Sequence, residues 1–106
     1  MSRTISISEF KSLLGDKSIS IIDVRRKADL SADNGAIQGA TWQDPEQIST
    51  WSESLAQDQE IILYCVRGGS VSNAVVDTLQ AKGLKARYIE GGIVAWKDAG
   101  GDVVQK

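Results

Sequence analysis

Short apolar runs alternate along this chain with amphipathic stretches of helical length. The clearest runs, Ile19 to Val24 and Glu60 to Tyr64, are rich in β-branched and other large apolar residues. Runs of this length and composition are typical of strands buried on both faces of a parallel sheet. Because strands alternate with helices, we predict an α/β fold with a mainly parallel central sheet of about five short strands and helices on both faces. A chain of 106 residues suits one domain, to which we assign residues 1–106.

The remaining elements are predicted from periodicity and from residues that begin or end helices. Shorter strands are expected at Thr4–Ile5, Thr41–Trp42 and Arg87–Ile89. Ser6 and Asp44 are predicted to be helix N-cap residues. Gly15 and Gly83 are predicted to end helices. The most regular helix is expected to begin at Ser70, and a short final helix to cover Ile93–Ala99. The expected apolar face of the regular helix comprises Val71, Ala74, Val75, Thr78 and Leu79. Residues 25–40 lack clear periodicity and are predicted to be a loop.

Composition excludes several functional classes. The chain has no histidine and one cysteine, so an internal disulfide and any catalytic triad with a histidine base are impossible. No cluster of potential metal ligands appears, and we expect no metal and no cofactor. The net charge is −2 with scattered basic residues, which argues against a nucleic-acid partner. No apolar run approaches the length of a membrane span, so no membrane partner is expected. A free cysteine suits the cytoplasm, the expected location.

The one cysteine, Cys65, lies where a parallel sheet binds its ligands. It follows the predicted strand that ends at Tyr64 and precedes Gly68, Gly69 and the helix at Ser70. Ligands of open α/β sheets bind beyond the carboxyl ends of strands, and free N–H groups at a helix N-terminus favour anions. The two glycines are expected to let successive N–H groups turn inward. Cys65 is therefore a candidate nucleophile that needs no histidine base.

Alternatives to this interpretation remain open at this point. Cys65 could be an inert core cysteine, since free cysteines are often buried. A phosphate-binding loop is disfavoured because residues 66–70 lack the Gly-Lys-Ser/Thr ending of a nucleotide P-loop. Arg25 and Arg67 are candidates to add positive charge for an anionic substrate, although each could be an ordinary surface charge.

Four segments in order resemble the rhodanese family, and the resemblance spans nearly the whole chain. They are Ile21-Ile22-Asp23-Val24-Arg25, Gly35-Ala36-Ile37-Gln38-Gly39-Ala40, Cys65-Val66-Arg67-Gly68-Gly69-Ser70 and Glu90-Gly91-Gly92-Ile93-Val94-Ala95-Trp96. The third is similar to the six-residue active-site loop of that family. Two positions depart from the family pattern: Ala36 stands where histidine is usual, and Ser70 where arginine is common.

The resemblance implies a thiosulfate sulfurtransferase that carries sulfane sulfur as a persulfide on Cys65. The donor would be a small anion such as thiosulfate, and the acceptor cyanide, a thiol or a protein thiol. The sulfur would be held by the backbone N–H groups of the loop residues Val66, Arg67, Gly68, Gly69 and Ser70. The side chain of Arg67 would face the donor. Asp23 and Arg25 would brace the loop, Gly91 and Gly92 would allow a close turn beside it, and Trp96 would pack in the core.

Rival functions differ in what they require of this loop. A cysteine phosphatase or arsenate reductase needs an arginine six residues after the cysteine, where Val71 stands. A rhodanese-like module that only binds a partner would typically lack the cysteine. A persulfide carrier would use the same chemistry with a protein acceptor, and because the chain has no second cysteine, that acceptor must come from outside.

Overall fold

The central sheet has five strands, all parallel, in the order β1-β6-β5-β2-β4. The structure is a computed structural model that describes residues 3–14, 19–32, 35–55, 57–67 and 69–105. The strands are β1 (Thr4–Ile5), β2 (Ile19–Asp23), β4 (Thr41–Trp42), β5 (Glu60–Tyr64) and β6 (Lys85–Ile89). β5 lies at the centre, paired with β2 on one side and β6 on the other, so its carboxyl end is the middle of that sheet edge.

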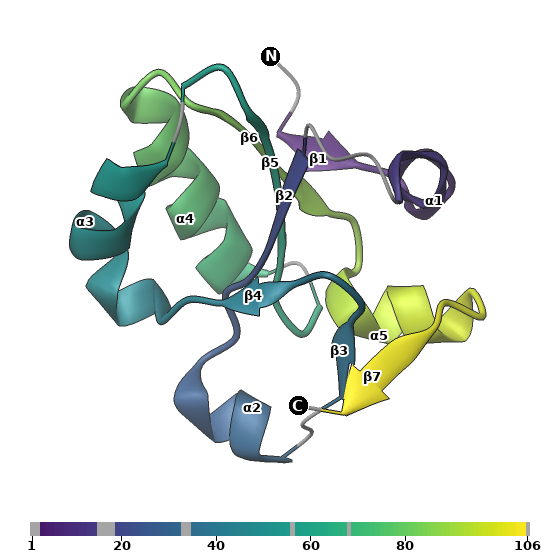
Figure 1. Cartoon of the computed structure of the whole chain (residues 1–106). Coiled ribbons are helices and arrows are strands. Elements are labelled where there is room, and N and C mark those ends of the chain that lie inside the picture. The colour runs from purple at the N-terminus through teal and green to yellow at the C-terminus, as the bar shows by residue number, and fades with distance from the viewer. Residues whose placement is uncertain (1–2, 15–18, 33–34, 56, 68, 106) are drawn as a thin grey trace.

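Helices cover both faces of this sheet, which confirms the predicted fold class (Figure 1). The helices α3 and α4 pack on one face, and α1 and α5 on the other. The helical elements are α1 (Ile7–Leu13), α2 (Lys27–Ala32), the 3₁₀ turn η1 (Pro45–Gln47), α3 (Ile48–Trp51), the 3₁₀ turn η2 (Ser52–Ser54), α4 (Ser70–Ala81) and α5 (Gly92–Asp98). A second, antiparallel pair joins β3 (Gly35–Ile37) to β7 (Val103–Gln105).

Alternate residues of β5 enter two separate core layers. Ile61, Leu63 and, beyond the strand end, Cys65 belong to the layer beneath α3 and α4. Ile62 and Tyr64 belong to the layer beneath α1 and α5. This alternation is the period of two of an extended chain, and it explains why the strand is apolar throughout. The same alternation fixes the side on which the Cys65 side chain lies.

The helix-terminal signals act as predicted where the structure describes them. Ser6 Oγ accepts a hydrogen bond from the Glu9 N–H at 3.2 Å, and Asp44 Oδ1 accepts one from the Glu46 N–H at 2.9 Å. Gly83 ends α4 with a φ of +82°, a conformation that glycine adopts without a steric penalty. The predicted stop at Gly15 lies outside the described residues.

Two expectations were wrong, and one strand was missed. Residues 25–40 are not a loop throughout, because they contain α2 and β3. Strand β7 had not been expected, since only pairing with the distant β3 makes it a strand. The buried face of α4 comprises Ser72, Val75, Val76 and Leu79, whereas Ala74 is exposed. The buried face of the helix is therefore shifted from the predicted one, since it includes the polar Ser72 and leaves Ala74 exposed.

None of the helices in the described ranges is both long enough and apolar enough to cross a membrane.

Candidate active site

Cys65 lies directly beyond the carboxyl end of β5 and five residues before α4 begins. Its side chain is buried, with 6% of the residue exposed, in the core layer that α4 covers. It is a free cysteine. Cys65 therefore lies in the chain between the end of the central strand and the start of α4, with its side chain in the core layer that α4 covers.

The helix α5 holds the first two carbonyl groups of the loop that starts at Cys65. The N–H of Ile93 donates to the Cys65 carbonyl at 3.0 Å, and the N–H of Val94 donates to the Val66 carbonyl at 3.1 Å. This contact requires glycine at position 92, where φ is +64° and a Cβ would lie 2.5 Å from both the Cys65 and the Val66 carbonyl oxygens. The Gly91-Gly92 turn thus brings α5 against the backbone of the cysteine loop.

These two hydrogen bonds also fix the direction of two N–H groups. A trans peptide unit is planar, and its C=O and N–H point in opposite directions. Because the Cys65 and Val66 carbonyls point at α5, the N–H groups of Val66 and Arg67 point away from it. Within the described part of the chain, no hydrogen bond satisfies either N–H. Both are available donors next to Cys65.

The other end of the loop enters α4. Gly69 is the N-cap residue, and the first backbone hydrogen bond of the helix runs from the Asn73 N–H to the Gly69 carbonyl at 3.1 Å. The N–H groups of the residues between them are the donors that every helix leaves without an intrahelical partner. Gly69 has a negative φ of −94°, and nothing lies within 4 Å of a Cβ built there. The expected steric need for glycine therefore does not hold at Gly69, and Gly68 lies outside the described residues.

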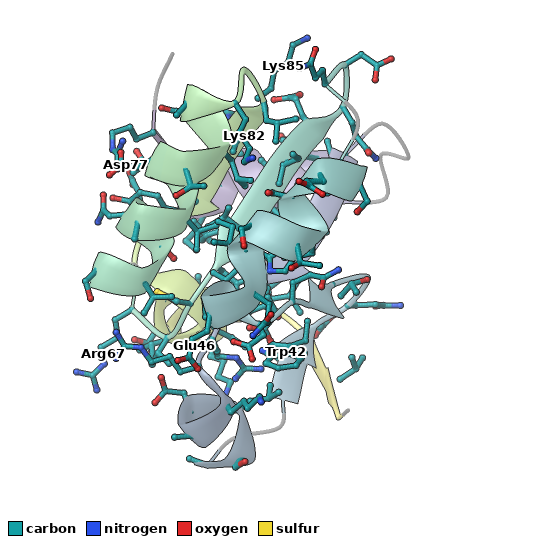
Figure 2. All side chains as sticks on the ribbon, turned by 90° about the vertical axis from the view of Figure 1, so that its left-hand side faces the viewer. Trp42, Glu46, Arg67, Asp77, Lys82 and Lys85 are labelled. Carbon is teal, nitrogen blue, oxygen red and sulfur yellow. The ribbon has the colours of Figure 1, made fainter. Side chains whose placement is uncertain are left out.

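Arg67, whose side chain was predicted to face the donor, is exposed, and so is Ser70, which was predicted to contribute its backbone N–H. Figure 2 shows Arg67 extending outward at the same end of the molecule as Glu46 and Trp42, and opposite Lys82 and Lys85. Val66 is half-buried. The guanidinium of Arg67 is thus on the surface beside the loop, where it can meet an anion arriving from solvent.

Asp23 and Arg25 form a buried ion pair at the carboxyl end of β2. Only 2% of Asp23 and 1% of Arg25 are exposed, and Arg25 Nη2 lies 2.7 Å from Asp23 Oδ2. Arg25 Nη2 also donates to the Gly35 carbonyl at 2.9 Å, which joins β2 to β3. Of the two roles considered for Arg25 from sequence, this burial against a carboxylate favours the brace over a positive charge presented to a substrate.

Tyr64, the residue immediately before Cys65, contacts this ion pair. Its ring lies 5.9 Å from the Arg25 guanidinium carbon, and its hydroxyl oxygen accepts a hydrogen bond from the Ile37 N–H at 3.2 Å. Burial, with a smaller contribution from the charge of Asp23, raises the pKa of Tyr64 far above its ordinary value. The phenol therefore stays protonated and serves as a structural contact between β5 and β3.

Two residues of α4 near the loop were not among the sequence candidates. Ser72 is fully buried, and its Oγ has no hydrogen-bond partner among the residues that the structure describes. Asn73 donates from Nδ2 to the Gly69 carbonyl at 3.1 Å. The sequence signal for Asn73 was an amide near the start of a helix that follows a glycine-rich loop, but its other partners, Arg3 and Tyr88, are distant in sequence.

Other predicted positions are buried packing residues. Ala36 is 1% exposed and sits in β3, where it pairs with Val104. Trp96 is 2% exposed, stacks edge-on against Phe10 at 5.2 Å, and donates from Nε1 to the Asp102 carbonyl at 2.8 Å. Ala36 is therefore well enclosed where the resembling family usually has histidine.

Cys65 lines neither of two well-defined surface grooves formed by described residues. The larger, about 920 Å³, runs past the exposed end of α1 and the β2–β4 side of the sheet. The smaller, about 360 Å³, lies between η1 and the first turns of α4 and is lined in part by Ser70 and Val71. The smaller groove adjoins the cysteine loop, whereas the larger one lies among different elements. In the ranges described, no three potential metal ligands are grouped.

Comparison with known proteins places this architecture in a family. The model of the rhodanese-like domain matches residues 6–99. A rhodanese-related protein from Thermoplasma volcanium is 26% identical over 99% of this chain and 100% of its own, with a TM-score of 0.85. A rhodanese-like domain protein from Staphylococcus aureus is 30% identical over 99% of both chains, with a TM-score of 0.81.

A third similar structure has a different description. A Rhodopseudomonas palustris protein of unknown function, described as a possible tyrosine phosphatase, is 26% identical over 96% of this chain and 84% of its own, with a TM-score of 0.83. The search among curated proteins found no match.

Proposed function

Since the chain belongs to the rhodanese-like domain family, we propose that it is a sulfurtransferase that moves sulfane sulfur through a persulfide on Cys65. The observation that carries the proposal is the position of Cys65. It lies at the end of the central strand, in a loop whose peptide carbonyls are held at one end by α5 and at the other end by α4. The N–H groups of the same peptide units therefore have fixed directions. Such fixed donors stabilise negative charge on sulfur without a histidine, which this chain lacks.

The reaction would proceed in two displacements at sulfur. The Cys65 thiolate attacks the sulfane sulfur of thiosulfate, a new S–S bond forms, and sulfite leaves with the electron pair of the broken S–S bond. An external thiophile such as cyanide or a thiolate then attacks the outer sulfur, and the thiolate of Cys65 is regenerated. The net oxidation state of the protein is unchanged, so no cofactor is needed.

The side chains near Cys65 suit a small anionic donor. Arg67 is exposed beside the loop and would meet the sulfonate oxygens of the donor. The N–H groups of Val66, Arg67 and Ser70 would hold the sulfur that Cys65 receives. In this proposal Asp23 and Arg25 act as a structural brace, because both are buried and bonded to one another.

Phosphoryl chemistry is less well supported, despite the phosphatase description of one similar protein. A cysteine phosphatase needs an arginine that clamps the oxyanion six residues after its nucleophile. That position is Val71, which is half-buried and packs against the core layer beneath α4. A persulfide carrier with a protein acceptor remains compatible with the proposed chemistry and differs from the enzyme only in the second step.

The persulfide itself is a directly measurable prediction. Incubation with thiosulfate in the absence of an acceptor should add one sulfur atom, about 32 Da, to the intact protein. Dithiothreitol should remove the added mass, and Cys65→Ser should never acquire it. A mass increase that persists in Cys65→Ser, or no increase with thiosulfate or any other sulfane donor, would refute the proposed function.

A further inference from the structure

We propose that Asn73 is a positioning residue for the sulfur site, acting through the Gly69 carbonyl to aim the N–H of Ser70 at the cysteine loop. The inference rests on the proposed function, since it assigns a task to one of the N–H donors which that function uses. It concerns the end of the loop remote from α5, where the Gly69 carbonyl is held by α4 instead.

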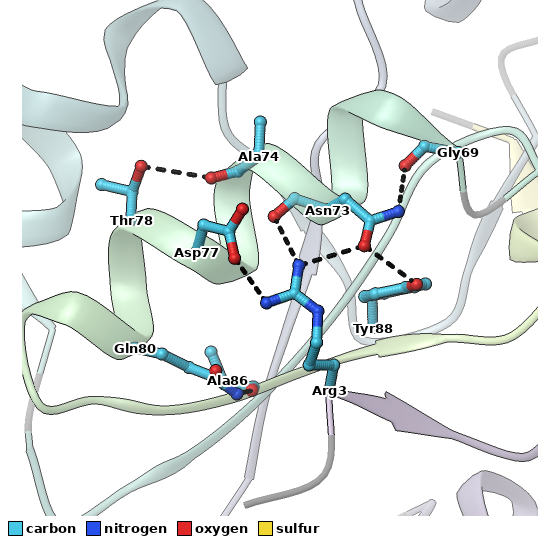
Figure 3. Close-up of polar contacts among 9 residues, drawn as sticks. All are labelled: Arg3, Gly69, Asn73, Ala74, Asp77, Thr78, Gln80, Ala86 and Tyr88. Atoms are coloured by element: carbon cyan, nitrogen blue, oxygen red, sulfur yellow. Dashed lines mark hydrogen bonds and ion pairs between the residues drawn. The ribbon is translucent and has the colours of Figure 1, made fainter.

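The Gly69 carbonyl is bound twice by the same residue. The backbone N–H of Asn73 donates to it at 3.1 Å. The side-chain Nδ2 also donates to it at 3.1 Å (Figure 3). A helix normally supplies only the first of these hydrogen bonds. The second makes Asn73 the side-chain group that holds the N-cap carbonyl of α4 from within the helix.

The direction of the Ser70 N–H follows from the geometry of one peptide unit. The Gly69 carbonyl and the Ser70 N–H belong to the same planar trans peptide and point in opposite directions. Because Asn73 draws the carbonyl toward the body of α4, the Ser70 N–H points away from the helix, back toward the loop it caps. Gly69 has no side-chain cap, and a Cβ built on it would meet nothing within 4 Å. Among the described residues, the contacts that hold its carbonyl are therefore the backbone and side-chain hydrogen bonds from Asn73.

The Asn73 side chain is itself held in one orientation. Its Oδ1 accepts hydrogen bonds from Arg3 Nη2 at 3.0 Å and from the Tyr88 hydroxyl at 3.2 Å. Arg3 also donates to the Asn73 carbonyl at 3.2 Å and forms an ion pair with Asp77 (Figure 3). Two donors at Oδ1 exclude the flipped amide, since a flipped NH₂ would face both of them. The NH₂ group is therefore committed to the Gly69 carbonyl.

The consequence for the reaction is electrostatic. Negative charge is present on the attacking thiolate and on the outer sulfur of the persulfide, and a fixed N–H donor stabilises it without reorganising. A peptide at Gly69 that can rotate would offer this donor only part of the time. Asn73 thus raises the rate of sulfur transfer without touching the sulfur.

The test compares threonine and valine at position 73, which are nearly isosteric. Threonine in a helix donates from Oγ1 to the carbonyl four residues earlier, as Thr78 does to the Ala74 carbonyl at 3.1 Å in the same helix. Asn73→Thr therefore keeps a donor for the Gly69 carbonyl, whereas Asn73→Val removes it. Thr78→Val is the matched control, because it removes the same type of hydrogen bond two turns from the loop start (Figure 3).

The measured quantity is the single-turnover rate at which saturating thiosulfate loads Cys65, followed by intact mass, together with the thermal midpoint of each variant. We expect Asn73→Val to load about tenfold more slowly than the unchanged protein. Displacing an N–H donor should slow the reaction less than deleting that donor would. Asn73→Thr should remain within about threefold, and Thr78→Val should be unchanged, by the same reasoning.

Equal loading rates in Asn73→Val and Asn73→Thr would overturn the inference, whether both were fast or both slow, because the Gly69 contact would then not control the rate. A slow Thr78→Val would also overturn it, by showing a general effect of helix stability. If valine prevents folding, Asn73→Ala against Asn73→Ser gives the same comparison. A wild-type protein that never loads sulfur would refute the proposed function, whereas normal wild-type loading with insensitive variants would refute this inference alone.

Discussion

Replacement of Gly92 by alanine should remove most of the proposed sulfurtransferase activity and destabilise the fold by about 2–4 kcal/mol. Two separate effects add up in this estimate. Position 92 has a φ of +64°, which costs an L-residue roughly 1–2 kcal/mol. In addition, a Cβ there would lie 2.5 Å from the carbonyl oxygens of Cys65 and Val66, and backbone atoms cannot yield as a flexible side chain can. The collision would push α5 away from the cysteine loop.

Activity should fall because the same shift would break the hydrogen bonds that Ile93 and Val94 donate to the loop. Urea denaturation measures the stability term, and thiocyanate formation from thiosulfate and cyanide measures the activity term. Gly100→Ala is the matched control: its φ of +82° carries the same backbone penalty, but nothing lies within 4 Å of the added Cβ. A Gly92→Ala protein that resembles Gly100→Ala in both measurements would contradict the close-approach argument.

The buried ion pair should show the second large effect. Asp23→Ala leaves the Arg25 guanidinium buried, with 1% of the residue exposed, and without its carboxylate. Removing one partner of a buried pair typically costs about 3–5 kcal/mol, which is a large part of the stability of a domain this size. We expect Asp23→Ala to lower the free energy of unfolding by that amount in urea denaturation.

A double replacement separates the cost of an unpaired charge from the value of the pair. Asp23→Leu with Arg25→Met removes both charges and fills the space with apolar atoms, which often restores most of the lost stability. The double variant should therefore be more stable than Asp23→Ala by about 2 kcal/mol or more. A double variant as unstable as Asp23→Ala would contradict this account, because the instability of Asp23→Ala would then not come from the unpaired charge of Arg25.

Much of the central sheet and of the site could be predicted from sequence because their signals are local. The bounds of β5 and the start of α4 match the prediction, since an apolar run and a glycine-rich loop mark them within a few residues of Cys65. The helix α2 was missed because none of its residues is buried, so it has no apolar periodicity. Strand β7 was missed because its hydrogen bonds depend on a partner about seventy residues away.

The unpredicted parts of the site depend in the same way on distant contacts. The close turn of Gly91 and Gly92 beside the loop was expected from the family resemblance, but the two hydrogen bonds that α5 donates to the loop were not. The Asn73 amide is held by Arg3, seventy residues earlier, and by Tyr88 on the neighbouring strand. The role of Arg25 could not be decided from sequence either, since only burial against Asp23 distinguishes a structural ion pair from a surface charge.

The most direct test of the central claim, that Cys65 carries sulfur between two substrates, is thiocyanate formation from thiosulfate and cyanide by the unchanged protein and by Cys65→Ser. The account predicts catalytic turnover in the first and none above background in the second, with both proteins unfolding at similar urea concentrations. Equal activity in the two proteins would contradict it, because the sulfur would then be transferred without the one cysteine of the chain.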